Sequence, residues 1–311
     1  MNGSPARAAA RWVSGEVLDL ARTGPVAGSV TAVYGATVHA ELGGFVVALL
    51  PPGAPRMPNG LSVATGLAGE RAPYVGDPVV LTTEGLTAGG LAIAWDAERP
   101  PRWDPRVRRW SPRRLRGLRE RANAILGTLE PAADSLAQAG GFAPDDSGAR
   151  AGLEALFAAV RSGDPCDAAG AGRRLAGRGP GLTPAGDDVL AAAALTVASA
   201  GAVSTSAPAP WRAWLAALAP PDLRRRTTSV SATLLELAVR GRGIGPARDL
   251  LTPDPIHDRR LRQDLAGLRG LGHTTGAAYA ATIGTVALLL APGGTRTQRD
   301  RSTTRRRPHA S

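Results

Sequence analysis

The order of two sequence patterns along the chain constrains its fold most strongly. From Gly28 to Trp95, short segments rich in Val and Thr are separated by Gly and Pro at turn spacing, which is typical of strands. After a connector rich in Pro and Arg, helical periodicity dominates the rest of the chain. Because a run of strands followed by a run of helices indicates an α+β fold, we expect a small antiparallel β-sheet or barrel-like lobe and then a mainly α-helical lobe.

The changes in pattern divide the chain into five parts. These are an N-terminal lead-in (1–27), the β-rich lobe (28–97), a connector (98–111), the helical lobe (112–292) and an arginine-rich tail predicted to be disordered (293–311). Helices are expected at 112–130, 149–161, 164–177, 184–200, 210–218, 227–240, 257–268 and 273–290. No apolar run reaches the roughly 20 residues of a membrane span, and the N-terminus lacks the apolar core of a signal peptide. We therefore expect a soluble, cytoplasmic protein.

The positive charge of the chain is local. The formal net charge is +11, and residues 102–121 carry a net +7 while residues 293–311 carry a net +5, which leaves the remainder almost neutral. In the first cluster Leu115, Leu118 and Ala122 fall on one helical face, so the arginines are expected on a solvated face. A docking face for an acidic partner subunit is the alternative. No groove-reading motif accompanies the charge, so we do not expect nucleic acid as a partner.

Residue types that are missing exclude several kinds of chemistry. All 37 basic residues are arginine, so the chain has no phosphate-loop lysine and no Schiff-base lysine. The single Cys166 excludes an internal disulfide and any multi-cysteine metal site, and no two histidines have metal-ligand spacing. Backbone amides, hydroxyl groups and arginine must therefore hold any bound anion.

The segment GRGPGLTPAGDD, residues 177–188, has the residue types of an anion site. A Gly-rich bend leads to Thr183 and Pro184, which suit the N-cap and first position of a helix. Helix N-termini bind anions through backbone N–H groups and the positive end of the dipole. The candidate substrate-binding residues here are Gly179, Gly181, Thr183 and Gly186, with Arg178 as counter-charge.

Two adjacent carboxylates, Asp187 and Asp188, follow in the first helical turn. Acids at this place can simply complement the helix dipole. As functional groups they could orient a substrate amide, act as general base, or hold Mg²⁺. The sequence demands no cofactor, and Mg²⁺ is the one that these carboxylates would suit.

Two further segments carry candidate polar groups. In LGHTTGAAYA, residues 271–280, His273 stands at a helix start beside Thr274 and Gly276, and the alternative is a capping histidine without a ligand. In RRRTTSVSATLLELAVRG, residues 224–241, Thr227 and Thr228 offer hydroxyl groups to an anion or, equally, to a helix N-terminus.

The same three segments resemble one bacterial family. GRGPGLTPAGDDVLAA is similar to the GLGPGLTPSGDDFLAG signature of the AllH-like subunit of oxamate carbamoyltransferase, and TTSVSATLLELAVRG and LGHTTGAAYAA are similar to its other recurrent segments in the same order. The resemblance covers roughly residues 28–290. It implies a site lined by Gly179, Gly181, Thr183, Gly186, Asp187 and Asp188, with Thr227, Thr228, His273, Thr274 and Gly276 as secondary residues.

The resemblance also implies an activity and partners. It implies phosphate-dependent carbamoyl transfer between oxamate and oxalurate, in purine or allantoin breakdown, by a hetero-oligomer with two other subunit types. Asp187, Asp188 and His273 are then the candidate catalytic residues, and carbamoyl phosphate, phosphate or an oxoacid is the small anionic ligand. The alternative is a non-catalytic subunit that binds a small anion or acts as a scaffold.

Overall fold

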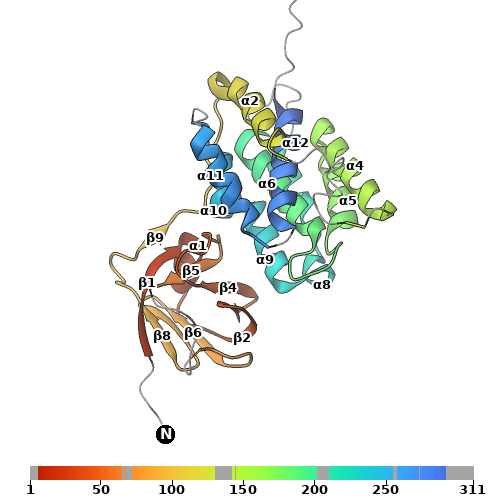
Figure 1. Cartoon of the computed structure of the whole chain (residues 1–311). Helices are drawn as coiled ribbons and strands as arrows, with labels where there is room; N and C mark the ends of the chain where they lie inside the picture. Colours follow the sequence, from red (N-terminus) through yellow and green to blue (C-terminus); the bar gives the residue numbers. More distant parts are fainter. Residues whose placement is uncertain are drawn as a thin grey trace, which may run out of the picture.

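The protein consists of a β-barrel followed by a helical region (Figure 1). The computed structural model describes residues 6–64, 67, 72–129, 142–143, 145–201, 210–254, 258–272 and 274–291. The predicted α+β class is confirmed. Among the described residues, no helix is both long and apolar enough to cross a membrane.

Short strands separated by turns build the barrel. The strands are β1 (Ala6–Ser14), β2 (Val26–Tyr34), β3 (Thr37–Leu42), β4 (Phe45–Leu50), β5 (Gly60–Val63), β6 (Pro78–Thr82), β7 (Gly85–Ala88), β8 (Leu91–Ala94) and β9 (Arg102–Trp103). Between β3 and β4, Gly43 and Gly44 have φ angles of 57° and 83°, as the two central residues of a type I′ hairpin turn require. Alternate residues of the strands, such as Val79 and Leu81, point into the barrel core.

The barrel is closed, so of the two predicted alternatives the barrel-like lobe is confirmed and the small antiparallel sheet is wrong. In the described residues the strands follow the order β5-β4-β3-β2-β6-β7-β8-β1-β9, and β5 also pairs with β1, so eight strands form a ring with β9 at its margin. Three of the pairs are parallel: β1 with β8, β1 with β9, and β4 with β5. Closure leaves the eight strands without free edges, which satisfies their backbone hydrogen bonds.

The segment predicted as a lead-in supplies the closing strand. β1 lies within it and pairs with β5, β8 and β9, and the helix α1 (Gly15–Ala21) follows directly with Ser14 as N-cap. The sequence of β1, ARAAARWVS, is rich in Ala and Arg and lacks the Val and Thr content that marks β2, β3, β4 and β6. Pairing within the barrel therefore decides its conformation where local propensity does not.

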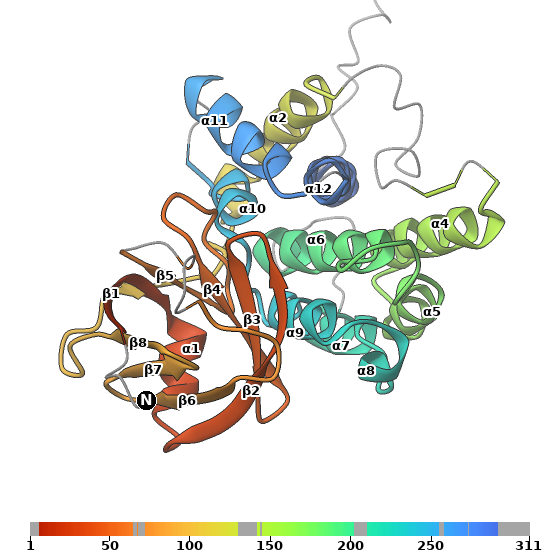
Figure 2. The same ribbon diagram turned by 60° about the horizontal axis from the view of Figure 1, so that its bottom comes forward.

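The helical region packs against one side of the barrel (Figure 2). Its helices are α2 (Leu115–Leu126, preceded by a 3₁₀ turn at Pro112–Arg114), α4 (Ser147–Ser162), α5 (Pro165–Leu175), α6 (Ala185–Ala200), α7 (Trp211–Leu218), α8 (Leu223–Arg226), α9 (Ser229–Ala238), α10 (Gly245–Leu250), α11 (Asp258–Arg269) and α12 (Thr275–Leu290). The Thr233 hydroxyl of α9 accepts from the Val46 amide of β4 at 3.3 Å. Arg242 and Glu16 form a partly buried ion pair at 2.8 Å. The two parts thus share both apolar and polar contacts.

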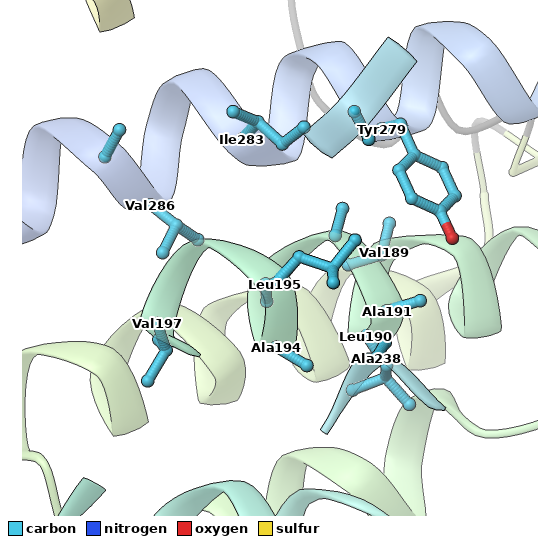
Figure 3. Packing of buried hydrophobic residues seen from close by; sticks show 14 of the residues in the cluster. Val189, Leu190, Ala191, Ala194, Leu195, Val197, Ala238, Tyr279, Ile283 and Val286 are labelled. Atoms are coloured by element: carbon cyan, nitrogen blue, oxygen red, sulfur yellow. The ribbon is translucent and has the colours of Figure 1, made fainter. Parts of the chain in front are cut away.

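Helix α6 is the centre of the helical core. Nearly all of its residues are buried, because Ala, Val and Leu occupy every face. A helix that is apolar all round must be covered on all sides, and α12, α9, α7 and α5 pack against it. Figure 3 shows the contact with α12, where Ile283 and Val286 lie above Leu195. The first turn of α6, which carries the two aspartates, is held in place by this packing.

One arginine of the basic cluster departs from the predicted solvated face. Arg121 on α2 is 6 % exposed, and its guanidinium donates to the carbonyl oxygens of Leu250 at 3.1 Å and Asp254 at 2.5 Å. It also lies 5.9 Å from the centre of the Trp110 ring. Arg121 therefore ties α2 to the end of α10.

We expect Arg121→Ala to lower the free energy of unfolding by about 3 kcal/mol, because the buried Leu250 carbonyl and the partly buried Asp254 carbonyl lose a charged donor. The exposed Arg113, in the turn before α2, is the matched control. Arg113→Ala should change stability by no more than about 0.5 kcal/mol. Urea denaturation of both variants measures the difference, and equal effects would contradict the structural role of Arg121.

Candidate functional site

The bend before α6 depends on glycine. Gly177, Gly179 and Gly181 have φ angles of 75°, 107° and 96°, a region that residues with a side chain rarely adopt. A Cβ atom on Gly177 would overlap the Arg226 carbonyl oxygen, and one on Gly179 would lie 2.9 Å from the Ala185 amide nitrogen. The glycines therefore allow the bend to lie close to both the start of α6 and the chain before α9.

The N-cap of α6 lies one residue after Thr183, the N-cap that the sequence predicted. Pro184 is the N-cap, and its carbonyl accepts from the Asp187 amide at 2.9 Å and the Asp188 amide at 3.3 Å. The Gly186 amide donates to the Arg178 carbonyl at 2.8 Å. Because proline has no side-chain acceptor, backbone carbonyls satisfy these N–H groups. Most amides of the first turn are thus already engaged within the protein.

Asp187 joins the bend to the segment before α9. Its side chain is buried, Oδ1 accepts from the Gly177 amide at 2.8 Å, and Oδ2 accepts from the Thr227 hydroxyl. Burial raises the pKa of Asp187, while hydrogen bonds from Thr227 and Gly177 act in the opposite direction. The carboxyl group is therefore fixed in one orientation by residues from two different segments.

Asp188 turns toward α12 instead. Burial raises its pKa to about 8, and Asp187 adds to the rise, while hydrogen bonds from Thr275 and Thr183 lower it. The hydroxyl oxygens of Thr183 and Thr275 lie 3.1 Å apart, which is hydrogen-bond distance. Oδ2 of Asp188 has no hydrogen-bond partner within the described part of the chain. At neutral pH this side chain is mainly a neutral acid that can donate a hydrogen bond.

Arg178 and Thr228 tie the bend to neighbouring helices. Arg178 forms an ion pair with Asp146 at 2.7 Å. The Thr228 hydroxyl donates to the Leu182 carbonyl at 2.7 Å and accepts from the Ser231 amide at 3.1 Å, so it caps α9. The ion pair therefore connects the bend to the start of α4, and the Thr228 hydrogen bond connects it to the start of α9.

The structure places two predicted residues of the segment 271–280. Thr274 is the N-cap of α12 without a side-chain capping bond. Gly276 is buried so closely that a Cβ atom would overlap the Leu268 carbonyl oxygen. His273 lies outside the described residues. Among the residues that the structure describes, no group of three or more His, Cys, Asp and Glu side chains could hold a metal ion.

The three segments singled out in the sequence therefore meet at the start of α6. Asp187 contacts Thr227, Thr228 contacts Leu182, and Thr183 contacts Thr275. Sequence reasoning did not include Thr275 or Tyr279 among the candidates. Their spacing of four residues in a predicted helix, which places both on one face, could have indicated them.

The comparison with protein families concerns this same part of the chain. Residues 175–287 match the family model described as oxamate carbamoyltransferase subunit AllH. Over this segment the chain is similar to the AllH family. The AllH match confirms the resemblance and contains every candidate site residue, whereas the barrel lies outside it. No curated protein and no solved structure matches the chain.

Proposed function

We propose that the chain is a subunit of an oxamate carbamoyltransferase-type enzyme and binds a small anionic substrate at the start of α6. The observation that carries the proposal is that three separate segments of the AllH match meet around two buried carboxyl groups. Buried acids with shifted pKa values are typical of functional sites. The name of the family also supports assembly with other carbamoyltransferase subunits.

The proposed reaction is carbamoyl transfer, which we assign to purine or allantoin breakdown. In one direction, an oxygen of hydrogen phosphate attacks the terminal carbamoyl carbon of oxalurate, and the bond from that carbon to the inner nitrogen breaks. The phosphate proton is transferred to this nitrogen, which gives oxamate and carbamoyl phosphate. Such a reaction needs alignment of two anions and one proton transfer.

The two aspartates suit different parts of this reaction. Asp187, fixed by Gly177 and Thr227, would orient an amide N–H of the substrate or act as the base. Asp188 is mainly neutral at pH 7 and would donate a proton or a hydrogen bond. Gly179, Gly181, Thr183 and Gly186 remain the proposed binding surface, with Arg178 as counter-charge if it leaves Asp146. The candidacy of His273 rests on the sequence alone.

A second function is a subunit that binds an anion, or acts as a scaffold, without catalysis. Two observations favour it: most amides of the first turn of α6 are already bonded, and Arg178 is paired with Asp146. A carbamoyl phosphate ion would then need positive charge from another subunit. In this case the chain would contribute to substrate binding while the partners carry out the transfer.

Asp187→Asn in the assembled enzyme is expected to lower the rate of oxalurate phosphorolysis at least about 100-fold, as is typical when a general acid or base is lost. The assay compares the chain alone, the partner subunits alone and the full complex. Asp264→Asn on α11, a half-buried aspartate outside the site, is the control and should leave the rate unchanged.

Each outcome of this assay separates the two functions. A rate that falls with Asp187→Asn while the complex still assembles supports the catalytic function. An unchanged rate removes Asp187 from the mechanism. If the partners alone reach the full rate, the chain is not required for catalysis, and the non-catalytic function holds.

A further inference from the structure

Tyr279 brings a hydroxyl group to the start of α6. It lies on α12 four residues after Thr275, so both side chains share the face that packs on α6. Figure 3 shows the tyrosine hydroxyl directed toward the first turns of α6. Burial raises the pKa of Tyr279, and the charges of Asp188 and then Asp187 raise it further, which places the phenol near both carboxyl groups.

The unpaired oxygen of Asp188 is the second observation. Asp188 is 4 % exposed, yet its Oδ2 atom has no partner within the described residues. A buried polar atom without a hydrogen bond costs about 1–3 kcal/mol. Native proteins keep few such groups, and they are often parts of functional sites. An unpaired carboxyl oxygen close to a phenol hydroxyl therefore indicates a place for a ligand atom.

The groups around this place have a common chemistry. The Tyr279 hydroxyl, the hydroxyls of Thr183 and Thr275, and the Asp188 carboxyl group can all donate hydrogen bonds. Thr183 and Thr275 are partly exposed while Asp188 and Tyr279 are buried, so the threonine pair lies on the solvent side. A ligand group with several hydrogen-bond acceptors would enter between Thr183 and Thr275 and then contact the buried Asp188 carboxyl group and Tyr279 hydroxyl.

We propose that Tyr279 and Asp188 form a donor pair that binds the carboxylate group of a small oxoacid, with Thr183 and Thr275 at its entrance. The inference rests on the proposed function and deepens it, because it assigns the oxoacid rather than the phosphate to this part of the site. A protonated acid beside a carboxylate ligand shares one proton between them, which makes binding depend on pH. Tyr279 is then a ligand-binding residue.

The test is titration calorimetry of the full chain with oxamate, inorganic phosphate and oxamide, which has an amide in place of the carboxylate. Oxamate should bind more tightly than phosphate or oxamide. Tyr279→Phe should weaken oxamate binding at least about 10-fold, since a hydrogen bond to a charged group is lost, and should leave phosphate binding unchanged. The control is Tyr74→Phe, an exposed tyrosine of the barrel that should have no effect.

A second readout separates ligand binding from a purely structural role. Oxamate affinity of the parent protein should fall about 10-fold per pH unit above pH 8, as the proton of Asp188 is lost. The titratable groups that act on Asp188 within the described residues are Asp187 on α6 and Tyr279 on α12, and α5, α7 and α9 contribute none. Asp188→Asn keeps a donor that does not titrate, so its oxamate affinity should lose this pH dependence.

The outcomes distinguish the inference from the proposed function. If the complex transfers carbamoyl groups while Tyr279→Phe binds oxamate unchanged, the inference alone is wrong. If oxamate binds and Tyr279→Phe weakens it, the inference holds even where the complex transfers nothing. Equal binding of oxamide and oxamate would overturn the assignment of a carboxylate, and absence of oxamate binding would overturn the inference altogether.

Discussion

Gly186→Ala is expected to lower the free energy of unfolding by about 3 kcal/mol or more, the upper range for overpacking of a core. A Cβ atom at this position would overlap the Leu175 carbonyl oxygen and lie 3.2 Å from the Arg178 carbonyl oxygen. Both obstacles are backbone atoms, so no side chain can turn aside to make room. The end of α5 and the bend would have to move away from α6, and the hydrogen bond from the Gly186 amide to Arg178 would be strained.

Gly117→Ala provides the matched control in another helix. Gly117 lies in α2, where the nearest heavy atom to an added Cβ would be 3.6 Å away, in the Trp110 ring. Because alanine favours a helix over glycine, this substitution should raise stability by about 0.5–1 kcal/mol. Denaturation in urea measures both variants. Destabilisation of similar size in the two would show that close packing of Gly186 is not the cause.

The same substitution has a consequence for the candidate site. Gly186 stands next to Asp187, whose Oδ1 accepts from Gly177 on the far side of the bend. Movement of the bend would lengthen that bond and separate Thr183 from Thr275. We therefore expect Gly186→Ala to lose ligand binding at temperatures where the fold persists.

The helical region could be predicted from the sequence more fully than the barrel. The segment predicted at 184–200 is α6 (Ala185–Ala200), and the one at 273–290 is α12 (Thr275–Leu290), because continuous Ala and Leu packing leaves few other solutions. For the β-rich lobe, the sequence left an open sheet and a barrel-like lobe as alternatives and could not decide between them. Barrel closure depends on the pairing of β1 with β5, which are far apart in the sequence, and local patterns do not record such pairing.

The candidate site shows a similar division. The sequence indicated which segments carry polar groups, since Gly-rich bends and hydroxyl residues at helix starts are local features. Neighbouring helix positions point about 100° apart, which directs Asp187 and Asp188 to different neighbours. The sequence did not show which residues each aspartate contacts, because tertiary packing decides this. The sequence also indicated Arg178 as the counter-charge of a bound anion, whereas in the structure Arg178 forms an ion pair with Asp146 at the start of α4.

The stability of the protein should fall as pH rises from about 4 to about 8, and Asp188 should be the main cause. The pKa of Asp188 is about 8 in the folded protein against 3.8 for an ordinary aspartate. Between these values the folded protein binds more protons than the unfolded chain, so each increase in pH favours unfolding. One proton corresponds to a slope of about 1.4 kcal/mol per pH unit. Above pH 8 both states are ionised and the slope should vanish.

Asp188→Asn tests this expectation directly. Because asparagine does not titrate, the stability of the variant relative to the parent protein should rise with pH across the same window, as measured by urea denaturation at intervals from pH 5 to pH 9. The pKa of Asp264 is raised to about 6, by burial and then by Asp249. Asp264→Asn is therefore a control: the difference in its free energy of unfolding from that of the parent protein should become constant above pH 6.

Parallel stability curves for Asp188→Asn and the parent protein would mean that Asp188 is already ionised in the folded state. An ionised Asp188 beside Asp187 would place two negative charges at the start of α6, and a carboxylate ligand would then be repelled. The pH dependence of stability, which needs no substrate, thus decides whether the start of α6 can accept an anion at neutral pH. A neutral Asp188 removes one of the two possible negative charges at the start of α6. The dipole of α6 and the hydrogen bonds from Gly177 and Thr227 stabilise the ionised form of Asp187.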